Sequence, residues 1–180
     1  CFSTINNFII TIKGKGGHGA IPYLAKDPIT AGANIVNSLN TIISRQVNSF
    51  MPAVLSVCSF NAGSSVNIIP DEAVIKGTIR TFDKDLRTGI EKRINDICEG
   101  MSKAMDVNIL TEFVFDAPPV INDDELTDKF IVCAKELIGE TNVLTDIHPS
   151  MVSEDFSYFS ELVPSVYFFL GGRNEEKGYV

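Results

Sequence analysis

The sequence of 180 residues contains no tryptophan and only two histidines, His18 and His148. Two histidines are too few for this chain to build a His-rich metal centre by itself. Its four cysteines include no CxxC pair, which excludes a zinc knuckle and a CxxC redox motif, and they are too sparse for a disulfide scaffold. Cys58, in an apolar run, and Cys98, on a predicted helix face, are therefore expected to be buried free thiols.

Basic residues are outnumbered, since 15 Lys and Arg face 23 Asp and Glu and the net charge is −8. Such a charge argues against nucleic acid and anionic membrane surfaces as partners. No apolar run approaches the ~18–20 residues that a membrane span needs. No secretory signal is visible, which together with free thiols favours a cytoplasmic location. Because the sequence opens on Cys1 rather than Met, we expect it to begin inside a longer protein.

The composition is that of a folded globular chain, with 44% hydrophobic and 21% charged residues, and the length suits one or two domains. Strands are predicted at 8–12, 53–60, 73–82 and 107–115 from β-branched runs and alternation. Asp27-Pro28 and Asp83 begin helices whose apolar residues repeat at helical spacing. The resulting order, β-α-β-β-α-β, predicts an α+β, ferredoxin-like domain over residues 8–116, with both helices on one sheet face.

Asp116-Ala117-Pro118-Pro119 breaks this pattern and is typical of a domain boundary. Beyond it, Asn122 is expected to cap a helix that Gly139 ends, and residues 156–162 suit a short helix. Val166–Leu170 is continuously apolar, which predicts a strand buried on both faces of an α/β sheet. Residues 119–180 contain too few neighbours for that strand, so we expect them to be a fragment of a larger α/β domain.

Five groups of residues could carry chemistry, and each has a simpler structural interpretation. The glycine-rich run 14–20 can aim His18 at a ligand, but a flexible loop with a surface histidine is the more common case. It matches neither a P-loop nor a dinucleotide fingerprint. The run 67–71, with Asn67 at its start, is more often a plain loop that proline ends. Arg80, expected on the helix-free face of its strand, can bind a carboxylate or be paired and solvated.

The other two groups lie in residues 119–180. Glu154 and Asp155 could serve acid/base chemistry or hold a metal, although such a pair more often caps the helix that follows. His148 precedes a proline and is more often part of a loop than a ligand.

The order GKGGHGA, DP, SR, NIIPDEA, GTIRTFD, SEDFSYF and FFLG resembles the M20 family of zinc-dependent amidohydrolases and peptidases. Within it, the sequence is most similar to the branch that hydrolyses N-acyl amino acids and hippurate-like conjugates. The resemblance covers essentially the whole chain. It implies a lid and dimerisation domain at 8–116 and, at 119–180, part of a catalytic domain that holds two divalent ions, zinc or manganese.

The resemblance also implies roles for three residues. His18 matches a lid histidine that enters the partner subunit's active site and stabilises the oxyanion of the tetrahedral intermediate. Asn67 matches an asparagine that also crosses the dimer to contact substrate, and Arg80 matches the arginine that binds the substrate carboxylate. Lids of the family pair edge to edge, which implies a homodimer.

The family's metal ligands and general base are not matched by residues of this chain, and the last ligand would lie just beyond Val180. The resemblance therefore assigns no metal ligand here, implies that the chain alone binds no ion, and places Glu154 and Asp155 in supporting roles. We expect the chain alone to be inactive. Two alternatives remain open: a non-catalytic ferredoxin-like dimerisation module, and a small-molecule regulatory domain that uses the glycine-rich loop.

Overall fold

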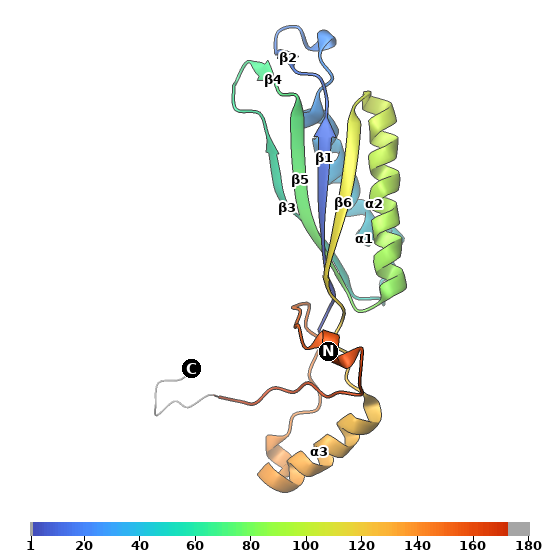
Figure 1. The fold of residues 1–180 in the computed structure, drawn as a ribbon, viewed down its shortest axis with the longest axis vertical. Helices are drawn as coiled ribbons and strands as arrows, with labels where there is room; N and C mark the ends of the chain where they lie inside the picture. Colours follow the sequence, from blue (N-terminus) through green and yellow to red (C-terminus); the bar gives the residue numbers. More distant parts are fainter. Residues whose placement is uncertain (1, 173–180) are drawn as a thin grey trace.

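The computed structural model describes residues 2–172, which form a sheet domain (residues 5–117) and a C-terminal segment (residues 118–172) below it (Figure 1). The sheet has four antiparallel strands in the order β3-β5-β1-β6. Their bounds are β1 Ile5–Lys13, β3 Ala53–Ala62, β5 Glu72–Thr81 and β6 Asn108–Ala117. This order, with two helices between the strands, confirms the predicted α+β, ferredoxin-like fold.

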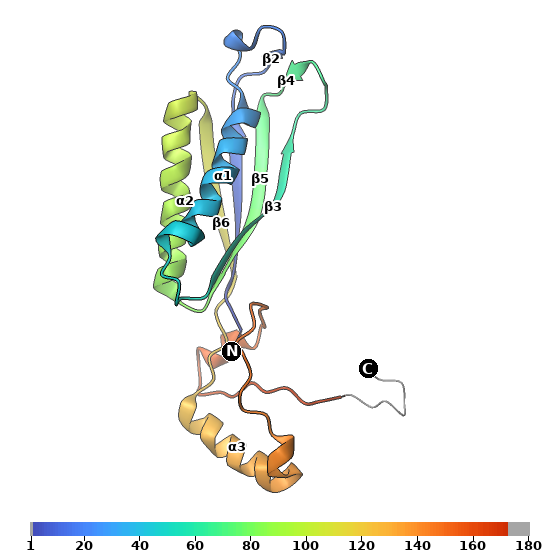
Figure 2. The same cartoon turned by 180° about the vertical axis from the view of Figure 1, so that it is seen from behind.

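Helices α1 (Pro28–Gln46) and α2 (Lys84–Met105) both cover the same face of this sheet (Figure 2). Each begins where the sequence predicts, since Asp27 and Asp83 accept hydrogen bonds from backbone N–H groups of the first turn. Alternate residues of β1 point at the helices and pack against one apolar stripe from each. The core of this packing consists of Phe8, Ile10, Ile12, Ile35, Leu39, Ile75, Ile79, Ile90 and Ile94.

Cys98 lies in this core, as predicted, and burial raises the pKa of its thiol to about 12. The prediction for Cys58 is wrong, because that residue is exposed. The β3–β5 register shifts between Val57 and Ser59, so Cys58 is the extra residue of a β-bulge. The prediction rested on the apolar run around Cys58, and such a run does not show on which side of the sheet a residue lies.

At one end of the sheet, away from the C-terminal segment, the chain forms the tip (residues 14–26 and 63–71). It contains a two-stranded ladder of β2 (Gly17–His18) and β4 (Ile68–Ile69), and the short 3-10 helix η1 (Pro22–Leu24). The tip therefore joins the loop after β1 to the loop before β5.

The C-terminal segment contains α3 (Asp124–Ile138), the 3-10 turn η2 (Glu140–Asn142) and the short helix α4 (Ser157–Ser160). Asp123, rather than Asn122, caps α3, and Asn122 instead bonds the backbone of Tyr167 through both its amide atoms. Val166–Leu170 forms no strand, contrary to the prediction, and Phe168, Phe169 and Leu170 are exposed. No strand of the described residues pairs with this stretch.

Residues 2–4 run through the C-terminal segment before β1 begins. Phe2 pairs with Val120 and Ser150, and its ring meets Tyr167 edge-on with centroids 5.1 Å apart. Two neighbouring stretches of chain, 3–5 and 117–119, thus join the sheet domain to the segment below. Within residues 2–172, no helix is both long and apolar enough to cross a membrane.

Gly77 offers a test of the core, because a Cβ at this position would collide with the Phe8 ring and the Ser56 carbonyl oxygen. We expect Gly77→Ala to lower the free energy of unfolding by about 1–3 kcal/mol, as overpacking does. Gly89→Ala, on the exposed side of α2 where a Cβ meets nothing within 4 Å, should raise it by about 0.5–1 kcal/mol. Urea denaturation of both variants measures this, and equal effects at the two positions would contradict the packing described.

Candidate functional site at the tip of the sheet domain

The tip brings His18 and Asn67 together, although they are far apart in the sequence. His18 pairs with Ile68 across the β2–β4 ladder, and the N–H of Gly19 donates to the Asn67 carbonyl at 2.8 Å. Both side chains are exposed. The glycine-rich run and the NIIPD run, which the sequence presents as separate loops, therefore form one structure.

Two of the glycines allow this close approach of backbones. A Cβ on Gly14 would collide with the Lys26 carbonyl oxygen, and one on Gly16 would lie 2.7 Å from the Ile69 carbonyl oxygen. Lys15 and Lys26 exchange backbone hydrogen bonds of 2.9 and 2.8 Å, which close the segment between β1 and α1. A side chain at Gly16 would push the two loops apart, and one at Gly14 would break the closure of residues 15–26.

Asp71 holds the two loops in register. Its Oδ1 accepts the Gly16 N–H at 2.8 Å, and its backbone carbonyl accepts the Gly14 N–H, also at 2.8 Å. The first of these bonds involves a charged acceptor and is the stronger type. The sequence interpretation gave Asp71 no role, because a carboxylate in a loop carries no signal of the backbone that it binds.

The exposed donor of His18 can be inferred from its contacts. Its Nδ1 accepts the backbone N–H of Ala20 at 3.1 Å, so the neutral ring carries its proton on Nε2. Asn67 is arranged in the same way, because its Oδ1 accepts the Ser65 hydroxyl at 2.8 Å and its NH2 group remains as the donor. Each side chain therefore uses its acceptor within the tip and presents an N–H group outward.

His18 lies on β2 and Asn67 directly before β4, and a donor of this kind can bind an oxygen that carries negative charge. Within its own sheet domain the pair faces solvent. The chemistry available to the tip is therefore hydrogen-bond donation to an anionic oxygen that another molecule or chain supplies.

Arg80 lies elsewhere, near the opposite end of β5. Glu72 and Arg80 are about 27 Å apart along this extended strand. The neighbours Ile79 and Thr81 are buried under the helices, so Arg80 projects from the helix-free face, as predicted. Its Nη1 donates to the Thr78 hydroxyl and to the Ile79 carbonyl. The structure thus unites His18 with Asn67 and leaves Arg80 remote from both.

The residues predicted in the C-terminal segment make other contacts. Glu154 accepts a hydrogen bond of 3.3 Å from the Tyr167 hydroxyl, and α4 has no side-chain cap, so the capping interpretation is wrong. Partial burial and the Glu154 carboxylate raise the pKa of Tyr167 above its ordinary value. His148 is exposed in a loop.

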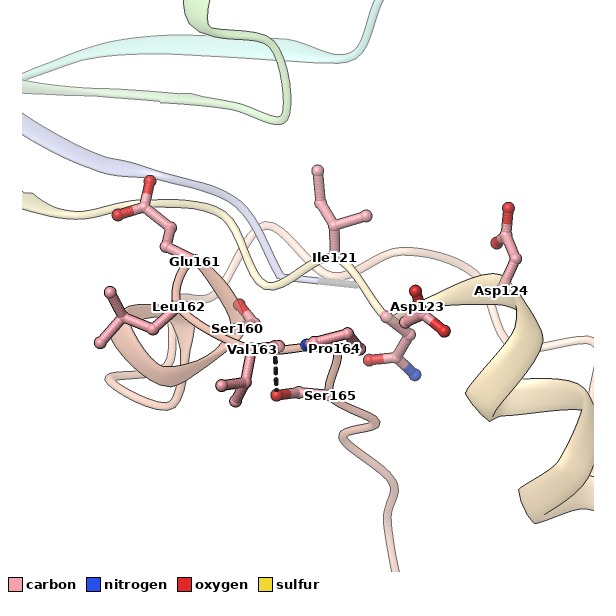
Figure 3. Close-up of a pocket in the computed structure, with 10 residues that line it drawn as sticks. Ile121, Asp123, Asp124, Ser160, Glu161, Leu162, Val163, Pro164 and Ser165 are labelled. Atoms are coloured by element: carbon pink, nitrogen blue, oxygen red, sulfur yellow. Dashed lines mark hydrogen bonds between the residues drawn. The ribbon is translucent and has the colours of Figure 1, made fainter.

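No group of three or more His, Cys, Asp or Glu residues between Phe2 and Gly172 is placed to hold a metal ion. An open hollow of about 510 Å³ lies between the start of α3 and residues 160–165 (Figure 3). Asp123, Asp124 and Glu161 line it, whereas His18, Asn67 and Arg80 do not.

Comparison with known proteins gives consistent matches. A family model described as the M20 peptidase dimerisation domain matches residues 3–106. A hippurate hydrolase of Campylobacter jejuni is 41% identical over 94% of this chain and 44% of its own length. An N-acetyl-L-cysteine deacetylase of Bacillus subtilis is 35% identical over 94% of this chain and 40% of its own length. The chain thus spans less than half the length of these relatives.

A solved structure of the YXEP protein of Bacillus subtilis superposes with a TM-score of 0.73 and 26% identity. The match covers 91% of this chain and 39% of that one. YXEP is described as a dinuclear metal binding peptidase of the M20 family.

Asp71→Ala tests the anchoring of the tip. The Gly16 N–H loses its acceptor, so we expect its hydrogen exchange to accelerate by about tenfold or more, the effect of losing a bond to a charged group. The Gly14 N–H donates to the backbone carbonyl of residue 71 and serves as an internal control whose exchange should change little. NMR measures the amide exchange rates of Gly16 and Gly14 in both proteins. Unchanged protection of the Gly16 N–H would show that Asp71 does not anchor the loop.

Proposed function

This chain belongs to the M20 family of peptidases and amidohydrolases, and from that membership we propose that the longer protein hydrolyses the amide bond of an N-acyl amino acid or a similar small conjugate. Two of its relatives are named for hippurate and N-acetyl-L-cysteine, which are both N-acyl amino acids. The observation that carries the proposal is the pair of outward N–H donors at the tip, from His18 and Asn67.

In this proposal His18 and Asn67 act on the oxygen of the scissile carbonyl. Attack on an amide carbonyl converts that oxygen into an oxyanion, and donors already in place stabilise the developing charge. The Nε2–H of His18 and the NH2 group of Asn67 suit this task because neither donor has to leave an internal partner first. A neutral imidazole donates here without any change of protonation.

Arg80 binds the free carboxylate of the amino-acid part of the substrate. A guanidinium group presents a planar fork of donors that matches a carboxylate. Rotation of Arg80 away from the Thr78 hydroxyl and the Ile79 carbonyl would present that fork to the substrate.

One chain cannot place all three groups on one small substrate. The scissile carbonyl and the carboxylate of an N-acyl amino acid are only a few ångströms apart, whereas Arg80 lies about 27 Å along β5 from the end next to the tip. We therefore assign His18 and Asn67 to one copy and Arg80 to the other copy in a homodimer. The match to a dimerisation domain supports this arrangement.

The described residues do not fit a metal centre, since none of their potential ligands cluster. The description of YXEP as dinuclear supports two divalent ions, zinc or manganese, in the longer protein. We place their ligands outside the described residues and derive no step through the ions from this chain.

Mixed dimers test the division of labour between the two copies. In the full-length protein we expect His18→Ala and Arg80→Ala each to lower kcat/KM for hippurate by about 10²–10³, the usual effect of losing one oxyanion or charge contact. Mixing the two variants creates dimers in which one site has both intact residues. Activity should then return to about a quarter of the wild-type value.

Arg93→Ala, on the exposed side of α2, is the matched control for Arg80→Ala and should keep full activity. Steady-state hydrolysis of hippurate before and after subunit exchange measures the effect. A mixture no more active than either parent would contradict the assignment of His18 and Arg80 to different copies.

The isolated chain should not hydrolyse hippurate or N-acetyl-L-cysteine, with or without added zinc or manganese, because its described residues bring no three potential metal ligands together. Product release followed by mass spectrometry measures this. Metal-dependent turnover by the purified 180-residue chain would show that the ligand placement is wrong.

A further inference from the structure

A second hollow, here called the base pocket, lies at the opposite end of the sheet domain from the tip. Its volume is about 560 Å³, within the ~300–1,000 Å³ range of small-molecule sites. The start of β1, the first turns of α2 and the end of β6 form one side, and residues 118–121 and Glu161 of the C-terminal segment form the other. The pocket is on the helix-covered face of the sheet, whereas Arg80 projects from the other face.

Two buried polar atoms in this pocket have no hydrogen-bond partner. Asn6 is fully buried, and its Nδ2 donates to Glu91 Oε1 at 2.5 Å, which leaves Asn6 Oδ1 without a donor. The Nε of Arg87 is also buried without a hydrogen bond and lies 3.6 Å from the same Glu91 oxygen. Buried polar atoms are normally satisfied, so these two atoms mark the polar floor of the pocket as incomplete.

The rim of the pocket carries two opposite charges. Lys84 lies on the sheet-domain side and Glu161 on the C-terminal side, and both are exposed. Among the described residues, neither makes a salt bridge. In Figure 3 the Glu161 and Ile121 side chains project on the same side of the C-terminal segment, and both line the pocket.

Two aromatic rings form part of the pocket wall. Phe113 and Phe115 line the pocket from β6, and the Arg87 guanidinium lies over the Phe115 ring at 4.3 Å from its centroid. This cation–π contact and the Glu91 carboxylate fix the arginine against the wall. Pro118 and Pro119 extend the apolar surface into the C-terminal segment.

We propose that the base pocket binds a free α-amino acid with an aromatic or large apolar side chain. The carboxylate of the ligand faces Lys84 and Arg87, and its ammonium group faces Glu161. Its side chain packs on Phe113 and Phe115. An unpaired cation, an unpaired anion and an apolar wall in one hollow match the three parts of such a zwitterion.

The proposal does not depend on the proposed hydrolysis, and its test uses binding alone. We expect L-phenylalanine to bind the purified chain saturably with one molecule per chain in calorimetry. In ¹H–¹⁵N NMR spectra, shifts should concentrate at Asn6, Arg87 and Phe115. 3-Phenylpropionate, which lacks the ammonium group, and phenethylamine, which lacks the carboxylate, should each bind about fivefold or more weakly.

Two substitutions assign the ends of the ligand. Lys84→Gln should weaken binding of L-phenylalanine about fivefold and leave phenethylamine unaffected, because only the carboxylate contact is lost. Glu161→Gln should weaken the binding of L-phenylalanine to a similar degree and leave the binding of 3-phenylpropionate unaffected. Both positions are exposed, so the variants should fold. Lys92→Gln and Glu136→Gln, exposed on α2 and α3 outside the pocket, are the matched controls and should bind normally.

Absence of saturable L-phenylalanine binding to the folded chain would overturn the proposal, and a water molecule between Asn6 and Arg87 would then account for the two polar atoms. Binding that neither Lys84→Gln nor Glu161→Gln weakens would also overturn it, because the ligand would then lie elsewhere.

Discussion

Strand β1 is hydrogen-bonded along both of its edges, and its register fixes the rest of the sheet domain. Phe8 lies opposite Gly77 on β5 and Phe113 on β6, and the inward residues of β1 fill the middle of the core. A slip of one residue would turn Phe8, Ile10 and Ile12 away from the helices. The same register brings Lys13 beside Glu72 at the tip and Asn6 beside Phe115 at the base pocket. Core packing therefore determines the positions of both candidate sites.

Much of this fold could be predicted because its signals are local. Asp27-Pro28 begins α1 through side-chain capping and a favourable proline, and alternation along β1 and β5 is preserved in the buried faces. Two predictions that rested on apolar runs, the burial of Cys58 and the strand at Val166–Leu170, were wrong. Cys58 is exposed at a bulge next to the inward Val57, and Val166–Leu170 has no neighbouring strand among the described residues.

The candidate site could also be predicted from the sequence only in part. Arg80 could be placed on the helix-free face because strand periodicity decides it. The meeting of His18 with Asn67 depends on two strands of two residues each, which are too short to show any period. Their suggested roles came from the family resemblance, and the structure adds the internal hydrogen bonds that leave one donor free on each. The distance between the tip and Arg80 follows from the length of β5. Because of this distance, the proposal assigns His18 and Asn67 to one copy of the chain and Arg80 to the other.

The two stretches of chain that enter and leave the sheet domain are themselves paired, since Ile5 lies opposite Ala117. The ends of the domain are therefore separated by about the 4.5–5.5 Å between neighbouring antiparallel strands. A body whose ends meet so closely can be inserted into a loop of another domain, or removed from it, without stretching that loop. The sheet domain therefore has ends suited to an insertion, since a chain that carried such a body would need only one tight turn in its place.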